Sequence, residues 1–341
     1  MASQETRVLD EIIASRRALL VGGGAALAAL ALPAAARAAS TVTTFGDTDI
    51  LNFALNLEYL EANFYYLAAF GTNISTTNSL YPTGAMLQGI TGTGTQGTVT
   101  VKASPKVPFT TLAVASYAVE TAIEEGKHVN FLRTALGSAA VAQPQIDLMT
   151  SFNTLAMAAG IGPAFDPFAS DANFLIGVYI FEDVGVTAYH GAAPLISTTT
   201  TGKTYLAAAA GILAVEAYHA GLVRTTINAI DAANGNTALQ TLTQKISATR
   251  YALSKAVAPS SGTGSAAATA TDDIGVGTQT VSLEGSSVSA STLVDADPTN
   301  VIAFSRTTTQ VLNIVTGGGA ATAGTKATGV FFPTGLNGLF S

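Results

Sequence analysis

One short pattern occurs twice in this sequence, and the repetition constrains the fold more than any other feature. Each copy places a histidine three residues, and an arginine eight residues, after a glutamate: Glu125, His128 and Arg133 in the first copy, and Glu216, His219 and Arg224 in the second. Residues three apart on a helix lie on the same face. We therefore predict that each copy presents a glutamate and a histidine from one face of a helix.

A second repeated pattern precedes each of these segments. Glu58 is followed seven residues later by Tyr65, and Glu182 is followed seven residues later by Tyr189. Seven residues are close to two helical turns, so each glutamate shares a helix face with its tyrosine. The first half also contains an extra Gly- and Thr-rich segment, residues 72–109. We interpret the two halves as one helical hairpin written twice, with an insertion in the first copy.

Apolar periodicity and helix-end residues predict an all-α fold. The expected helices cover residues 47–70 with Asp47 as N-cap, 110–136, 144–159 opened by Pro144, 171–190 capped by Ser170, 203–233, 238–257 and a last short one at 305–316. A small hairpin is expected at 97–103 and some strand at 277–285. The apolar tail, 331–340, is expected to pack against the helices.

Composition excludes several classes of protein. The net charge of −7 and the pI of about 4.9 disfavour binding to a phosphate backbone, so nucleic acid is not expected as a partner. The chain has no cysteine, which excludes disulfides, thiolate metal sites and a cysteine nucleophile. A metal ion would have to be held by carboxylate, imidazole, hydroxyl or water.

The N-terminus has the pattern of an export signal. Arg16 and Arg17 precede a glycine-rich apolar run of about 15 residues, 18–32, which is short for a membrane span of roughly 20 residues. An A-x-A motif follows, so a twin-arginine signal peptide over 1–38 is predicted. We expect a periplasmic or secreted protein with no stable membrane span after processing. A retained N-terminal anchor is the alternative.

The repeated patterns together supply four carboxylates and two imidazoles. Two E-x-x-H helices, with one glutamate from each of two other helices, form the ligand set of di-iron and di-manganese carboxylate bundles. The six candidate ligands are Glu58, Glu125, His128, Glu182, Glu216 and His219. Two divalent ions would neutralise four buried glutamates, whereas each unpaired buried ion would cost several kcal/mol.

The chain resembles the ferritin-like superfamily and, within it, the bacterial and plant proteins called desiccation-related. The resemblance rests on LNFALNLEYLEANFYY, the two E-x-x-H segments and Y-x-G-A-A-P at the end of the third helix, and the segment DADPTNVIAFSRTTTQVLNIV is similar to the family's C-terminal region. It implies a ferritin-like four-helix bundle with a fifth helix over 45–257 and an irregular extension, 258–341, packed on it.

The resemblance also implies a site and a function. The six candidate ligands would bind two iron or manganese ions, with Tyr65 and Tyr189 as catalytic residues close by. The expected function is oxidation of Fe(II) by O₂ or peroxide in stress protection. A non-catalytic desiccation or metal-sequestering protein and a manganese centre that disproportionates peroxide are the alternatives, and the ligand types suit both metals. The protein can form an oligomer, but the insertion, the export signal and the tail argue against a hollow storage cage.

Glu61 and Glu124 compete for places in the ligand set. Glu61 lies one turn from Glu58, but the second hairpin has Gly185 at the equivalent position, so we favour Glu58. Glu124 precedes Glu125, and the repeat with its arginine favours Glu125.

Three further polar residues have structural interpretations. His190 follows Tyr189, and a helix-end histidine bound to backbone is favoured over a metal ligand. Arg133 and Arg224 are expected to pair with carboxylates near the site or to cover the end of the bundle.

Overall fold

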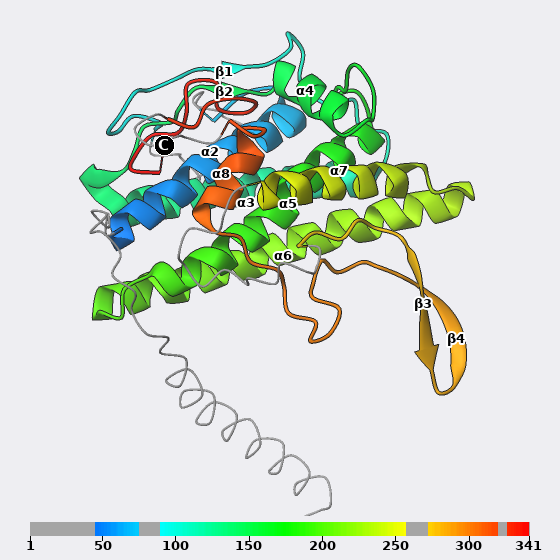
Figure 1. Cartoon of the computed structure of the whole chain (residues 1–341). Coiled ribbons are helices and arrows are strands. Elements are labelled where there is room, and N and C mark those ends of the chain that lie inside the picture. Colours follow the sequence, from blue (N-terminus) through cyan, green and yellow to red (C-terminus); the bar gives the residue numbers. More distant parts are fainter. Residues whose placement is uncertain (1–44, 75–88, 257–271, 320–325, 341) are drawn as a thin grey trace, which may run out of the picture. The chain divides into compact units, whose positions relative to one another are not determined.

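Helices make up most of the chain that the computed structural model describes, which is residues 45–74, 89–256, 272–319 and 326–340 (Figure 1). The helices are α2 (Asp47–Phe70), α3 (Leu112–Leu136), α4 (Thr150–Ala158), α5 (Asp171–Ala192), α6 (Thr200–Asn234), α7 (Ala238–Lys255) and α8 (Thr308–Val315). Short 3₁₀ turns, η2 (Gly137–Ala139) and η3 (Ala193–Leu195), follow α3 and α5. The predicted signal peptide, 1–38, lies outside the described residues.

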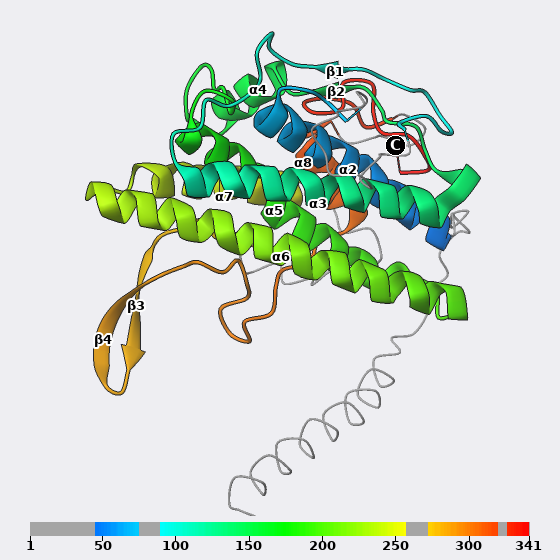
Figure 2. The same cartoon turned by 180° about the vertical axis from the view of Figure 1, so that it is seen from behind.

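The four long helices form two hairpins that pack together. Helix α2 packs along α3, and α5 packs along α6, as the repeated patterns predict. Figure 2 shows α3 and α6 side by side along one face, and Figure 1 shows α8 and α7 on the side of α2 and α5. The predicted all-α bundle with a fifth helix is therefore confirmed.

Local signals set most of the helix ends. Helix α2 ends at Gly71, whose φ of 77° lies in the left-handed region that favours glycine. Ser170 caps α5 as predicted, because its hydroxyl accepts a hydrogen bond from the Asn173 amide at 3.2 Å. Asp47 differs from the prediction: it is the first helical residue, and its carboxylate accepts two hydrogen bonds of 2.7 Å from Ser197 instead.

Helix α2 is buried on nearly all sides, so it is the central element of the bundle. Three of its buried asparagines fasten loops to it. Asn52 accepts a hydrogen bond from the Val141 amide at 2.9 Å, and Asn63 donates to the Gln143 side chain at 2.8 Å. Asn56 accepts from the Asn337 amide at 3.0 Å, so the tail is fixed to the same helix.

Two predictions between α2 and α4 were wrong. The segment 97–103 forms no hairpin: β1 (Val99–Thr100) pairs in parallel with β2 (Ile146–Asp147), because the buried chain at 140–148 offers its backbone to the insertion. Helix α4 begins at Thr150 and not at Pro144. The Asp147 carboxylate accepts a hydrogen bond from the Thr150 amide at 2.8 Å, which places the helix start three residues after Asp147.

A hairpin and a buried ion cluster characterise the C-terminal extension. Strands β3 (Thr278–Leu283) and β4 (Ser286–Ser291) pair antiparallel, which agrees with the strand expected at 277–285. Fully buried Arg306 lies 2.9 Å from Asp273, which also pairs with Arg250 of α7 at 2.7 Å. In the tail, Phe331, Phe332 and Leu336 are buried. The extension therefore completes the core of the bundle.

Helix α6 is, in the described part of the chain, the single helix long and apolar enough to cross a membrane. It packs against α5 and carries Glu216, His219 and Arg224, all of which are buried. Core helices of other folds have the same length and composition, so this feature says nothing of where the protein resides.

Candidate metal centre

The six side chains that the repeat singled out converge inside the bundle, one glutamate from each long helix. None of these six residues exposes more than 9% of its surface. They form two overlapping groups in which all ligand atoms lie within 4.8 Å of one another: Glu58, Glu125, His128 and Glu216 in one, and Glu125, Glu182, Glu216 and His219 in the other. Glu125 and Glu216 belong to both groups, so they are placed to bridge two ions.

The distances follow the two-fold repeat for Glu58 and Glu182, but both histidines face the same shared glutamate, Glu125. Nδ1 of His128 lies 3.4 Å from Glu58 Oε2 and 3.3 Å from Glu125 Oε2. Nδ1 of His219 lies 3.3 Å from Glu182 Oε2 and 3.1 Å from Glu125 Oε1. Each histidine therefore faces one glutamate of its own group and one shared glutamate, which is the arrangement that a dinuclear centre needs.

The two tyrosines cross between the hairpins. Tyr65 of the first hairpin donates a hydrogen bond to Oε1 of Glu182, and Tyr189 of the second donates to Oε1 of Glu58. Each bond occupies one carboxylate oxygen and leaves Oε2 facing the centre. The tyrosines thus orient the two glutamates that are not shared.

Several buried atoms in the centre have no hydrogen-bond partner. They are Oε2 of Glu58, Oε1 of Glu125, Oε2 of Glu182, both oxygens of Glu216 and Nδ1 of His219. Unpaired buried polar atoms are costly and rare in folded proteins. Hard oxygen and imidazole ligands in this number suit iron and manganese, so the residues present fit a pair of such ions.

Crowding of the carboxylates shifts their protonation. Burial raises the pKa of Glu58 to about 7, although the nearby His128 opposes the shift. Burial and the neighbouring carboxylates Glu125 and Glu61 raise the pKa of Glu216 well above its usual range. Burial disfavours a charged His128, yet Glu58 and Glu125 outweigh it and raise the pKa of the imidazole to about 11. Without metal, protons therefore neutralise the cluster.

Glu61 is buried but belongs to neither group of four. Its Oε1 lies 3.6 Å from the position that a Cβ on Gly185 would take, and the same position lies only 2.3 Å from Oε2 of Glu216. Any side chain at Gly185 would displace Glu216. The structure therefore explains why the second hairpin has glycine where the first has Glu61, and it places Glu58 rather than Glu61 beside His128.

Glu124 has a role that the sequence did not reveal. Its carboxylate lies 2.7 Å from Nε2 of His219, on the side of the ring away from the centre. It borders a groove between α3 and α6 together with Glu120, Thr121 and Val215. Glu125 is fully buried in the centre, as the repeat predicts, and Glu124 orients a histidine from outside it.

The remaining polar residues have structural partners. Nδ1 of His190 lies 3.1 Å from the carbonyl oxygen of Phe304, in agreement with the helix-end interpretation. Arg224 pairs with Asp183 at 3.0 Å, but Arg133 binds the hydroxyl of Tyr59 instead of a carboxylate. Tyr59 and Asp183 each follow a glutamate of the centre, so the two arginines make equivalent contacts in the two hairpins.

A helical bundle with paired glutamates and histidines at its centre is characteristic of ferritin-like proteins, and the sequence profile of the ferritin-like domain matches residues 46–229. The chain belongs to this family, which confirms the predicted resemblance. It is similar to desiccation-related protein PCC13-62 of Craterostigma plantagineum, with 31% identity over 185 residues, 53% of this chain and 53% of that protein. The chain thus spans about half the length of this curated relative. No solved structure matches the chain.

Proposed function

We propose that the protein binds two iron or manganese ions and, with iron, oxidises Fe(II) with O₂ or peroxide. The observation that supports the proposal most is the set of buried, unpartnered ligand atoms in two overlapping groups that share Glu125 and Glu216. Four glutamates carry the charge needed to balance two divalent ions. Two bound ferrous ions would together supply the two electrons that reduction of dioxygen to peroxide requires.

The side chains have distinct parts in this proposal. His128 with Glu58, and His219 with Glu182, would each bind one ion terminally, and the shared glutamates would bridge. Tyr65 and Tyr189 hold the terminal carboxylates in place through their hydroxyl groups. The carboxylates of Glu120 and Glu124 line a groove that leads to His219, and their negative charge would attract cations there.

The proposed setting is protection against stress outside the cytoplasm. The desiccation-related name of the relative and the predicted twin-arginine signal at Arg16 and Arg17 support this setting. A protein whose bundle only sequesters metal, or only stabilises itself, is the competing candidate, because the relative's name states no activity.

Metal analysis tests the proposal directly. We expect about two iron or manganese ions per chain in protein purified without added chelator. Replacing both histidines, His128→Ala with His219→Ala, should abolish this stoichiometry. His190→Ala is the matched control, because His190 binds a backbone carbonyl and belongs to neither group of four candidate metal ligands. Equal metal content in both variants would refute the assignment. Oxygen uptake on addition of Fe(II) then separates oxidation from sequestration.

A further inference from the structure

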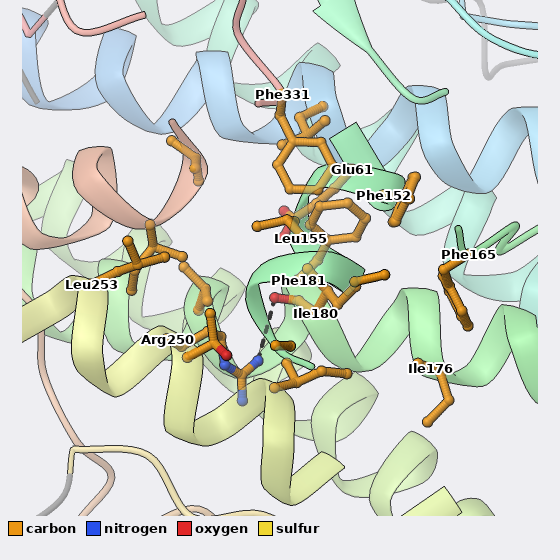
Figure 3. Close-up of a pocket in the computed structure, with 18 of the residues that line it drawn as sticks. Glu61, Phe152, Leu155, Phe165, Ile176, Ile180, Phe181, Arg250, Leu253 and Phe331 are labelled. Carbon is orange, nitrogen blue, oxygen red and sulfur yellow. Dashed lines mark hydrogen bonds between the residues drawn. The ribbon is translucent and has the colours of Figure 1, made fainter. Parts of the chain in front are cut away.

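An apolar cavity adjoins the metal centre on the side of α2 and α5. Its wall is built by α2, α4, α5, α7, α8 and Phe331 of the tail, and its volume is about 50 Å³. Figure 3 shows the carboxylate of Glu61 among apolar side chains, near Phe331 and Leu155. The extension beyond the ferritin-like match therefore closes a space that ends beside the ligands.

The cavity reaches the centre at Gly185. The bare backbone of Gly185 lies in the cavity wall, and a Cβ there would meet Oε2 of Glu216 at 2.3 Å. Both oxygens of Glu216 are buried and have no hydrogen-bond partner. Glu61, at 6% exposure, lies beside the same position. A molecule in the cavity would thus contact Gly185 and Glu61, which separate it from the shared ligand Glu216.

Size and polarity restrict what the cavity accepts. The charged group of Arg250 is turned away, since it binds Asp183 and Asp273 and, as the dashed line in Figure 3 marks, a backbone oxygen at 3.3 Å. Ions would lose hydration in such a space without compensation. A cavity of about 150 Å³ is needed to hold benzene, so a volume of about 50 Å³ suits a molecule of very few atoms.

We propose that this cavity binds dioxygen and delivers it to the metal centre. The inference rests on the proposed function and deepens it by naming dioxygen as the oxidant. Two ferrous ions each lose one electron, and dioxygen takes up these two electrons and two protons to leave as hydrogen peroxide. Ferrous ions would instead approach through the groove on the opposite face, which Glu120 and Glu124 line together with His219, so the two sides of the centre would admit different reactants.

Methyl NMR of the metal-free protein under dioxygen tests the binding step. Dioxygen is paramagnetic and broadens the signals of methyl groups that it contacts. We expect stronger broadening at Leu60 and Ile176, which line the cavity and expose 1% each, than at Leu132 and Ile227, which expose 1% and 0% but lie outside it. Equal broadening in the two sets would overturn the proposal.

Filling the cavity tests the link to the metal centre. Ala159, which follows α4, lines the cavity, so Ala159→Phe places a ring at its wall, and Ala158→Phe at the exposed last residue of α4 is the matched control. We expect Ala159→Phe to lose the selective broadening and to lower the rate of Fe(II) oxidation by dioxygen relative to the rate with peroxide. Ala156→Leu, a smaller change in the same wall, serves if the phenylalanine variant does not fold.

The outcomes separate the two proposals. Loss of broadening with an unchanged dioxygen rate would overturn the delivery of dioxygen by this cavity. Failure of the proposed function would look different, because the wild-type protein would then bind neither iron nor manganese, whatever the methyl spectra show.

Discussion

Oε2 of Glu124 lies 2.7 Å from Nε2 of His219, whereas the counterpart of Glu124 in the second copy of the repeat is the apolar Val215. A carboxylate behind a ligating imidazole orients the ring and raises its basicity. The two proposed metal positions would therefore be inequivalent, although the repeat supplies each with one histidine and one unshared glutamate.

Calorimetric titration of the metal-free protein with Mn(II) measures this inequivalence. We expect two distinct affinities in the wild type and, in Glu124→Gln, a loss of about 10-fold or more at the tighter position only. Val215→Glu should raise the affinity of the weaker position for Mn(II). Glu120→Gln is the control, because Glu120 is exposed one turn earlier on α3. Unchanged affinities in Glu124→Gln would show that the contact has no influence on binding.

The crossed tyrosines should contribute to stability even without metal. Tyr65→Phe removes the donor to Glu182 and leaves a buried carboxylate oxygen unpaired. We expect the free energy of unfolding to fall by about 1–3 kcal/mol in urea titrations. Tyr205→Phe serves as control, since its hydroxyl makes a single 3.5 Å contact with a backbone carbonyl. If both variants lost the same free energy of unfolding, the bond from Tyr65 to Glu182 would make no particular contribution to stability.

Metal should stabilise the protein more at neutral pH than in acid. The pKa of Glu58 is about 7 in the folded protein, above its ordinary value of 4.5, so the folded metal-free state binds a proton between these values that the unfolded chain does not. As pH falls through 7, protonation stabilises the metal-free fold, and metal must displace that proton.

Melting temperatures of metal-loaded and stripped protein test this dependence. At a free metal concentration 100 times the dissociation constant, the gain is about 2.7 kcal/mol, which corresponds to a shift of several degrees. The gap between the two forms should narrow steadily from pH 7 towards pH 5. A gap of constant size over this range would mean that Glu58 does not take part in binding.

Export should depend on the paired arginines. Arg16→Lys with Arg17→Lys keeps the positive charge but removes the twin-arginine motif. We expect the processed protein to disappear from the periplasm and the precursor to remain inside the cell, as judged by fractionation and immunoblot. Normal amounts of processed protein in the periplasm would favour the general secretory route.

The sequence predicted the bundle well because its signals are local. Helix α2 ends at the predicted residue, because Gly71 closes its apolar periodic run. The start of α4 was misplaced because Pro144 is equally suited to an extended segment, and only the burial of 140–148 favours that conformation. The pairing of β1 with β2 joins segments far apart in the chain, which alternation of residue types does not reveal.

Part of the candidate site could be predicted from the sequence, because the signals for it are also local. Spacing within one helix brought each glutamate into line with its histidine or tyrosine, and the repeat related the two halves. Contacts between helices could not be predicted from the sequence, because they depend on how each helix is rotated about its axis. The bond between Glu124 and His219 joins α3 to α6, and the cavity beside Glu61 depends on Phe331 in the distant tail.

The pairing of Asn56 with Asn337 has a consequence for biosynthesis. These two residues are 281 positions apart, and each is held by the other inside the core. A ribosome must add those positions before the outer side of α2 can be covered, so the nascent chain exposes that side throughout most of its translation. Contacts of such long range also slow folding. Newly made chains should therefore depend on chaperones that shield α2 until the tail arrives.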